Sequence, residues 1–286
     1  MDQRIIDLYD EYTHAPLDRR VFLARLAKLT GGAAAAAALV PLLEANQARA
    51  AIVSPEDSRL ETSRITYPGP TGAIKAYLAR PKGTSKLPAV IVIHENRGLN
   101  PHIEDVTRRA ALEGFLAIGP DLLSPVGGTP ANEDTAREMI GKLDGKQTVQ
   151  NLRSAVTFLE THAHGNGKVG AMGFCWGGGM VGELAVNAPD LDAGVVYYGR
   201  QPNAADVEKI AAPLLLHYAG LDTRINQGIP PFEEALRKAK KNYTIHIYDS
   251  ANHAFNNDTA QARYAKHAAE QAWARTIAFL KEHLKA

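Results

Sequence analysis

The only cysteine of the chain stands in a motif that is typical of catalysis. Cys175 lies in "GFCWGGG", a Gly-x-nucleophile-x-Gly pattern that follows an apolar run and precedes a helical pattern. This order is that of a nucleophile elbow, where Gly173 and Gly177 avoid collisions between Cβ atoms and backbone. A helix N-terminus would favour a thiolate at this position. We therefore expect Cys175 to be a nucleophile; the alternative is a buried, inert thiol.

Two further residues could complete this chemistry. A thiol needs a base for its proton, and the base needs a carboxylate that fixes its tautomer. Asp222 in "GLDT" and His253 in "NHAF" both follow apolar runs, in the chain order nucleophile, acid, histidine. We predict a triad of Cys175, Asp222 and His253. His162 and His164 lie in a polar loop without a matching third ligand, so no metal is expected.

Apolar runs and helical patterns alternate from about residue 63 to the C-terminus. Continuous apolar runs are typical of strands covered on both faces. The alternation predicts a single α/β domain with a mostly parallel central sheet and helices on both faces. In such sheets, ligands bind beyond the carboxyl ends of the strands, and the triad residues follow the carboxyl ends of expected strands. The expected strands are 73–81, 87–94, 115–122, 167–174, 193–199, 213–220 and 243–250, and the expected helices are 100–114, 146–162, one from 176, 231–241 and one from about 261.

The first fifty residues differ from the rest. "DRRVFLARL" carries paired arginines, an uncharged alanine-rich run follows, and "ARA" ends the segment at 48–50. These features are typical of a twin-arginine export signal, so we expect a leader over 1–50, the catalytic domain over 51–286 and a periplasmic protein. The uncharged run is too short for a comfortable membrane span. The alternative is a cytoplasmic protein that retains an amphipathic N-terminal helix, with Ile5, Leu8, Tyr9 and Tyr12 on one face, packed on a partner subunit.

Composition and charge indicate which kinds of binding partner the protein can have. Of the 286 residues, 45% are hydrophobic and 22% are charged, which is ordinary for a globular protein with a full core. The formal net charge is +1 with both signs interspersed, so nucleic-acid binding is not expected. A single cysteine excludes an internal disulfide. A small molecule is the expected partner, and a homodimer is left open.

These motifs, with "VIVIHENRGLN", "GPDLL" and "VVYYGR", are similar to those of the dienelactone hydrolase family (carboxymethylenebutenolidases), a Cys-His-Asp branch of the α/β-hydrolase fold. The resemblance runs from about Thr62 to the C-terminus. It implies that Cys175 is the nucleophile, His253 the base and Asp222 the residue that orients it. No metal or organic cofactor is implied.

The resemblance also implies roles for residues after the expected strands. Glu95 would contact the resting thiol and help to activate it, and the backbone N–H groups of Asn96 and Trp176 would form the oxyanion hole. Family members that act on dienelactone hold its carboxylate with an arginine four positions after the catalytic histidine. Here that position is Asn257, so the sequence does not favour dienelactone itself. Arg97, Arg200 and Arg224 follow expected strand ends and could supply positive charge to an anionic substrate; the alternative for each is a rim residue with a surface ion pair. Tyr198 is a further candidate for substrate binding.

The choice of sulfur suits a particular substrate. When a thiolate adds to an ester, the intermediate expels sulfur more readily than an unactivated alkoxide. Enol and aryl esters have better leaving groups, so we expect an activated ester or enol lactone to be cleaved through an acyl-thioenzyme. The alternatives are a non-catalytic binding protein on the same fold, and a hydrolase of phosphotriesters or amides.

Overall fold

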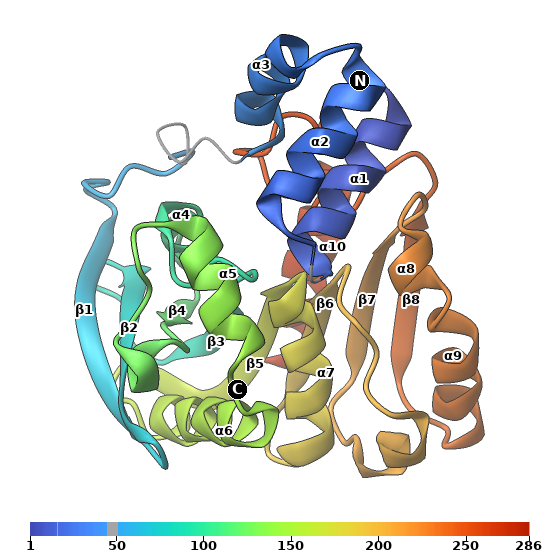
Figure 1. The fold of residues 1–286 in the computed structure, drawn as a ribbon. Coiled ribbons are helices and arrows are strands. Elements are labelled where there is room, and N and C mark those ends of the chain that lie inside the picture. The colour runs from blue at the N-terminus through green and yellow to red at the C-terminus, as the bar shows by residue number, and fades with distance from the viewer. Residues whose placement is uncertain (16, 45–50, 286) are drawn as a thin grey trace.

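The computed structural model describes residues 1–15, 17–44 and 51–285, and its centre is an eight-stranded sheet (Figure 1). The strands are β1 (Leu60–Gly69), β2 (Gly72–Pro81), β3 (Leu87–Ile93), β4 (Leu116–Pro120), β5 (Gly165–Phe174), β6 (Ala193–Tyr197), β7 (Leu214–Ala219) and β8 (Tyr243–Tyr248). Their order is β1-β2-β4-β3-β5-β6-β7-β8. β2 pairs antiparallel with β1 and β4, and the other neighbours are parallel. The predicted mostly parallel α/β sheet is confirmed.

Helices cover both faces of the sheet. They are α4 (Pro101–Leu112), α5 (Glu133–Gly141), α6 (Gly145–Glu160), α7 (Trp176–Asn187), α8 (Thr223–Asn226), α9 (Ile229–Lys238) and α10 (Lys266–His283), with short 3₁₀ turns at Ser124–Val126 and Ala204–Lys209. The apolar sides of α6, α7 and α9 join one core, and those of α4 and α10 join the other.

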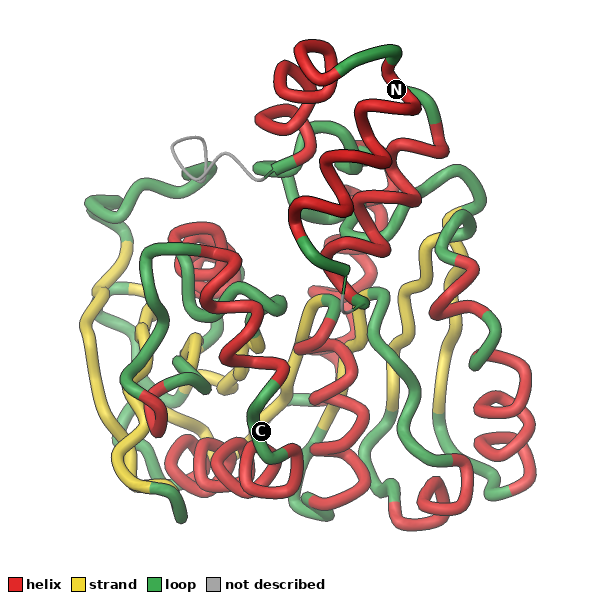
Figure 2. Tube along the Cα trace, viewed as in Figure 1, coloured by secondary structure: helices red, strands yellow, loops and turns green. Residues whose placement is uncertain are grey.

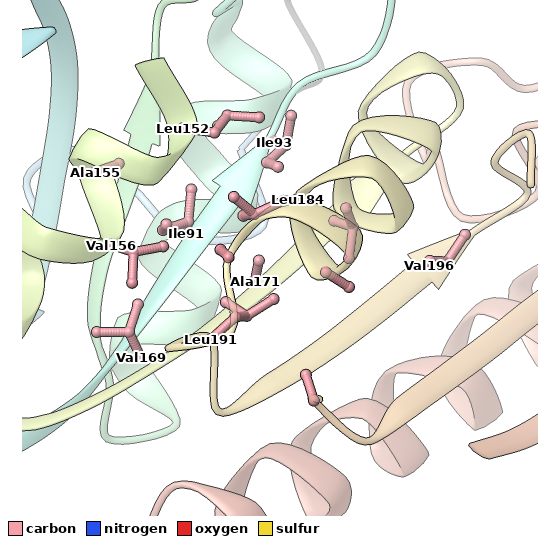
Figure 3. Close-up of a cluster of buried hydrophobic side chains, with 14 of the residues drawn as sticks. Ile91, Ile93, Leu152, Ala155, Val156, Val169, Ala171, Leu184, Leu191 and Val196 are labelled. Atoms are coloured by element: carbon pink, nitrogen blue, oxygen red, sulfur yellow. The ribbon is translucent and has the colours of Figure 1, made fainter. Parts of the chain in front are cut away.

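The strand β3 shows why the apolar runs are continuous. Its Ile91 and Ile93 belong to the core under α6 and α7, whereas Val90 and Val92 belong to the core under α4 and α10. Successive side chains of a strand point to opposite faces, so a strand covered on both faces needs apolar residues throughout. Figure 3 shows Ile91 and Ile93 among side chains of α6 and α7, with Leu184 on α7.

Three further helices form a separate group at the N-terminus: α1 (Gln3–His14), α2 (Arg19–Thr30) and α3 (Ala33–Leu43). Tyr9, Tyr12, Phe22 and Leu26 are buried in their shared apolar cluster, and the rings of Tyr12 and Phe22 stack with centroids 4.5 Å apart. The group lies at one end of the sheet, with α1 ending near the start of α7 (Figures 1 and 2). The apolar face of α1 thus packs within its own chain.

The predicted leader falls partly on these helices. The expected cleavage pattern at 48–50 lies outside the described residues. Among the helices that are described, none is by itself long and apolar enough to cross a membrane. Within the described residues, the pair α2 and α3 reaches that length and composition, and the two helices are bent by 111°.

β1, α5 and α10 differ from the sequence prediction, which also did not include the helices α2, α3 and α8. β1 was not expected, because it is an edge strand in which few side chains are buried and no continuous apolar run marks it. α5 is short and buries only Ala136 and Ile140, so its apolar pattern is weak. α10 begins at Lys266 rather than near Gln261, because turns occupy the intervening residues.

Candidate active site

The turn between β5 and α7 presents Cys175 at the carboxyl end of the sheet. Its backbone has φ 56° and ψ −116°, a conformation that L-residues rarely adopt and that is typical of a nucleophile elbow. A Cβ on Gly173 would lie 2.2 Å from the carbonyl oxygen of Gly177, and one on Gly177 would lie 2.4 Å from that of His94. Both flanking glycines are therefore required by close backbone contacts, as the sequence predicts.

Asp222 and His253 form a buried pair beside this turn. Asp222 follows β7, His253 follows β8, and the Asp222 Oδ2 and His253 Nδ1 atoms are 2.5 Å apart. The other Asp222 oxygen, Oδ1, accepts the backbone N–H of Ile225 and so caps α8. Burial alone would raise the pKa of Asp222, but the hydrogen bond and charge of His253 outweigh it and lower that pKa. With Nδ1 as the donor, Nε2 of the neutral His253 ring is the proton acceptor.

The structure brings the three predicted residues Cys175, Asp222 and His253 together. A ring nitrogen of His253 lies within 4.8 Å of the Cys175 sulfur. No hydrogen bond joins the two side chains among the described contacts, and catalytic hydrogen bonds often form only when substrate binds. The Nε2 atom of His253 is buried and has no hydrogen-bond partner among the described residues.

The sulfur has a different partner, which the sequence reasoning missed. The Nε2 atom of His14, the last residue of α1, lies 3.0 Å from the Cys175 Sγ. The rings of His14 and His253 meet edge to face with centroids 4.5 Å apart. Burial alone would lower the pKa of His14, but its electrostatic interaction with Cys175 and its contacts with Asp10 outweigh burial and raise that pKa. The signal in the sequence was the Asp10-x₃-His14 spacing, within a segment interpreted as a leader.

Glu95 follows β3 and is buried, as expected of a residue near the thiol. Its Oε2 accepts a hydrogen bond of 2.7 Å from Asn257, whose own oxygen accepts from Thr259. The resemblance implied a contact between Glu95 and the thiol, but the described contacts pair Glu95 with Asn257 and the sulfur with His14. The role of Glu95 stays a prediction.

The two residues expected to form the oxyanion hole lie on either side of the elbow. Trp176 is the first residue of α7, so its N–H has no intrahelical acceptor. Asn96 comes from the loop after β3, and its side-chain amide donates to the carbonyl oxygen of Thr13 at 2.8 Å. Both residues border the cavity that contains the thiol. Their N–H groups as oxyanion donors stay a prediction.

A cavity of about 850 Å³ opens beside the sulfur. Tyr198, Arg200 and Arg224 line it, as the sequence prediction of binding residues requires. The Nε atom of Arg224 also lies 3.3 Å from Asp10 of α1. Arg97 lines a smaller space of about 20 Å³, which Cys175 and His253 also line, and it pairs with Glu133 at 3.5 Å.

One group of side chains in the described part of the chain could hold a metal ion. Ligand atoms of His14, Cys175 and His253 all lie within 4.8 Å of one another. A thiolate and two imidazoles are ligands that zinc accepts. The sequence did not predict this group, because His14 was assigned to the leader.

A mostly parallel sheet with the nucleophile on a tight turn before a helix defines an α/β hydrolase. The family model described as "Dienelactone hydrolase family" matches residues 74–284, so the chain belongs to the dienelactone hydrolase family. It is therefore an ester or lactone hydrolase, as the sequence predicts. A second model, "YqhI-like", matches residues 1–32.

Named relatives agree with this assignment. A "Putative carboxymethylenebutenolidase" of Saccharolobus solfataricus is 36% identical over 253 residues, which cover 76% of this chain and 97% of the relative. A "Putative hydrolase fragment YghX" of Escherichia coli K12 is 49% identical over 112 residues, which cover 38% of this chain and 96% of the fragment. The first match supports the family, and the second supports a hydrolase.

Solved structures agree in fold. A "Putative Dienelactone Hydrolase" of Klebsiella pneumoniae has a TM-score of 0.71 at 29% identity, covering 78% of this chain and 99% of its own. A dienelactone hydrolase-like promiscuous phosphotriesterase from metagenomic libraries has a TM-score of 0.72 at 22% identity, covering 80% of this chain and all of its own. The second likeness shows the fold alone.

Proposed function

We propose that the chain cleaves an activated ester or an enol lactone through an acyl-thioenzyme on Cys175. The observation that carries this proposal is the strained turn, which holds the thiol at the start of α7 beside the Asp222–His253 pair. In the proposed reaction the sulfur attacks the carbonyl carbon and the leaving oxygen departs. His253 then activates the water that hydrolyses the thioester, while Asp222 holds its ring.

The preference for a good leaving group follows from the sulfur. A tetrahedral intermediate on Cys175 can expel either the thiolate or the alcohol oxygen, and the thiolate is the better leaving group unless the alcohol is an enol or a phenol. The backbone N–H groups of Asn96 and Trp176 would hold the oxyanion, a contribution of about 3 to 4 kcal/mol per donor in related chemistry.

The charges around the cavity favour an anionic substrate. The charged residues that line it are Arg137, Lys142, Arg200 and Arg224 on the positive side and Asp18 and Glu138 on the negative side. Asn257 pairs with Glu95 instead of presenting a cation, so the site differs from the arrangement that binds the dienelactone carboxylate. We propose that a negatively charged part of the substrate lies toward Arg200 and Arg224 instead.

Trapping the intermediate tests the nucleophile and the substrate class together. The enzyme is mixed with an enol lactone, an aryl ester, an amide or a phosphotriester, quenched in acid and weighed intact. We expect an acyl mass on Cys175 with the lactone and the aryl ester, and none in Cys175→Ala. Turnover by a folded Cys175→Ala variant would contradict the proposal, and a preference for the phosphotriester or the amide would favour those reactions instead.

Labelling with iodoacetamide distinguishes the enzyme from a binding protein on the same fold. A catalytic Cys175 reacts quickly in the native state near neutral pH, whereas an inert thiol reacts only on unfolding. We expect native labelling to abolish turnover in proportion to the fraction of Cys175 that is modified. Full labelling with full activity would rule out the covalent mechanism.

Export through the twin-arginine pathway is a separate proposal. It is supported by the paired arginines at positions 19 and 20 and the alanine-rich run that follows. N-terminal sequencing of protein recovered from its native host is the test. A start near residue 51 would agree with export and cleavage, and it would leave a mature protein without helix α1, so that no residue of α1 could act in the mature enzyme. A start at Met1 or Asp2 would contradict the proposal. A homodimer also stays a prediction, which light scattering would check.

A further inference from the structure

A second aspartate–histidine pair reaches the Cys175 sulfur from helix α1. His14 Nδ1 lies 3.1 Å from Asp10 Oδ1, and His14 Nε2 lies 3.0 Å from Cys175 Sγ. Asp10 and His14 are four residues apart, so both lie on one face of the helix. The Asp222–His253 pair approaches the same sulfur from the loops after β7 and β8. Two aspartate–histidine pairs therefore converge on one thiol. The Asp222–His253 pair is joined by a side-chain hydrogen bond, whereas Asp10 Oδ1 contacts His14 as an ion pair and has no hydrogen-bond partner among the described residues.

The surroundings of the His14 ring determine which nitrogen carries its proton. Nδ1 lies 2.9 Å from the carbonyl oxygen of Asp10 and 3.0 Å from Thr13 Oγ1. The Thr13 hydroxyl donates its own proton to the carbonyl oxygen of Tyr9, so its oxygen can accept from the ring. Nδ1 is therefore the donor. In the neutral ring, Nε2 is then an acceptor that faces the thiol of Cys175.

The two helix ends that meet here favour the charges that a proton transfer would create. His14 is the last residue of α1, and the partial negative charge at a helix C-terminus favours a cationic imidazole. Cys175 is the N-cap of α7, and the partial positive charge at a helix N-terminus favours a thiolate. The C-terminus of α1 thus stabilises the imidazolium of His14, and the N-terminus of α7 stabilises the thiolate of Cys175.

The catalytic domain holds the end of α1 with its own side chains. Carbonyl groups in the last turn of a helix lack intrahelical donors. Asn96 donates to the carbonyl oxygen of Thr13 and Arg137 to that of Tyr12, each at 2.8 Å. These donors come from separate segments, the loop after β3 and helix α5. The position of His14 is therefore fixed by specific contacts with the domain.

Space remains beside the sulfur while His14 is in contact with it. The cavity of about 850 Å³ is lined by His14, Cys175 and His253 together, with Tyr198 on its wall. A small ester could therefore reach the thiol without displacing α1. His14 itself lies outside residues 74–284, which the hydrolase family model matches, so it is an addition to that domain.

We propose that His14 is a second catalytic histidine, which takes the proton of the Cys175 thiol and so prepares the nucleophile. The S–H bond breaks, the proton binds His14 Nε2, and the sulfur keeps the electron pair with which it attacks the carbonyl carbon. When the C–O bond breaks, His14 returns the proton to the leaving oxygen. The role depends on the proposed function, because it requires Cys175 to be the nucleophile.

His253 then serves the second half of the reaction. Its buried Nε2, which has no partner among the described residues, takes a proton from the water that attacks the thioester. When the C–S bond breaks, the same proton passes to the sulfur and regenerates the thiol. The two histidines thus divide acylation and deacylation between them.

Single-turnover kinetics with a p-nitrophenyl ester separate the two roles, because nitrophenolate leaves without needing a proton. We expect His14→Ala to slow the first-turnover release of nitrophenolate by about 100-fold or more, and added imidazole to restore part of the rate. We expect His253→Ala to release one equivalent and then stall as the acyl-enzyme, visible by intact mass. His267→Ala, at an exposed histidine of α10, is the matched control. EDTA in all assays prevents metal bridging of the three ligands.

A second measurement distinguishes catalysis from obstruction. Iodoacetamide should label Cys175 more slowly in His14→Ala if His14 activates the thiol, and faster if α1 merely covers it. Acylation by His14→Ala at the control rate or above it would overturn the proposal. His14→Gln, which keeps most of the side-chain volume, replaces His14→Ala if circular dichroism shows that the alanine variant is unfolded. Loss of activity in Cys175→Ala with normal acylation in His14→Ala would reject only the role of His14.

Discussion

His14 and Cys175 are 161 positions apart in the chain, yet the His14 Nε2 and Cys175 Sγ atoms lie 3.0 Å apart. The contact joins a helix that precedes the sheet to the turn that presents the nucleophile. The N-terminal helices are thereby part of the wall of the candidate active site, and their attachment to the domain becomes measurable through the properties of that site.

The first prediction concerns this attachment. Arg137 donates to the carbonyl oxygen of Tyr12, and its guanidinium lies 4.3 Å from the centre of the Tyr12 ring. Arg137→Ala removes both contacts, which should weaken the docking of α1 by about 1.5 to 3 kcal/mol. We expect roughly ten- to hundredfold faster amide hydrogen exchange in α1, measured by mass spectrometry. Arg153→Ala on the exposed side of α6 is the control, and equal exchange in both variants would show that Arg137 does not hold the helix.

The second prediction concerns acid stability. The pKa of Asp222 is lowered in the folded protein from its ordinary value of 3.8. A group with a lowered pKa contributes stability above its unfolded value and loses it as the pH falls through the folded value. Asp222→Asn should therefore lose less stability than the wild type between about pH 5 and pH 2. Urea unfolding across this range is the measurement, and parallel curves for the two proteins would contradict the prediction.

The third prediction concerns the buried carboxylate of Glu95. Asn257 Nδ2 donates to Glu95 Oε2 at 2.7 Å, and both side chains are buried. Asn257→Ala removes this donor, which should lower the free energy of unfolding by about 1 to 3 kcal/mol. Asn187→Ala, at an exposed position of α7, should change it by less than about 0.5 kcal/mol. Equal midpoints in chemical denaturation would mean that Glu95 does not depend on Asn257.

The fourth prediction concerns the nucleophile turn. Because a Cβ on Gly173 would lie 2.2 Å from the Gly177 carbonyl oxygen, Gly173→Ala must displace the backbone that holds Cys175. We expect a loss of at least about 1 to 3 kcal/mol of stability and a loss of acylation. Gly141→Ala is the control, because no atom lies within 4 Å of its Cβ position. Wild-type stability and activity in Gly173→Ala would show that the turn tolerates a side chain.

The sequence predicts most of the sheet because its central strands are buried on both faces. Apolar runs mark β3, β5, β6 and β7, and these strands carry Glu95, Cys175, Tyr198 and Asp222 after their carboxyl ends. His253 follows the more exposed strand β8. β1 could not be found in this way, because its stabilisation comes from pairing with β2 rather than from an apolar pattern of its own.

The positions of the strands also explain which residues of the candidate active site could be predicted from the sequence. Cys175, Asp222 and His253 each follow a strand, so the rule for parallel sheets brings them together without any knowledge of distances. His14 follows no strand. Its approach to the sulfur depends on tertiary contacts such as those of Asn96 and Arg137 with the last turn of α1, and no local pattern encodes these.

The position of α1 against the domain also determines an order of events during folding. Gln3 Nε2 lies 2.6 Å from Asn252 Oδ1, so this contact closes a loop of 249 positions, nearly the whole chain. Contacts between residues so distant in sequence form slowly, since the intervening chain must be ordered first. During synthesis the amino-terminal helix emerges first, but its docking surface is complete only after β8 has been made. Helix α1 can therefore complete its docking only after most of the chain has been synthesised. We expect the contact between His14 and Cys175 to form in one of the last steps of folding.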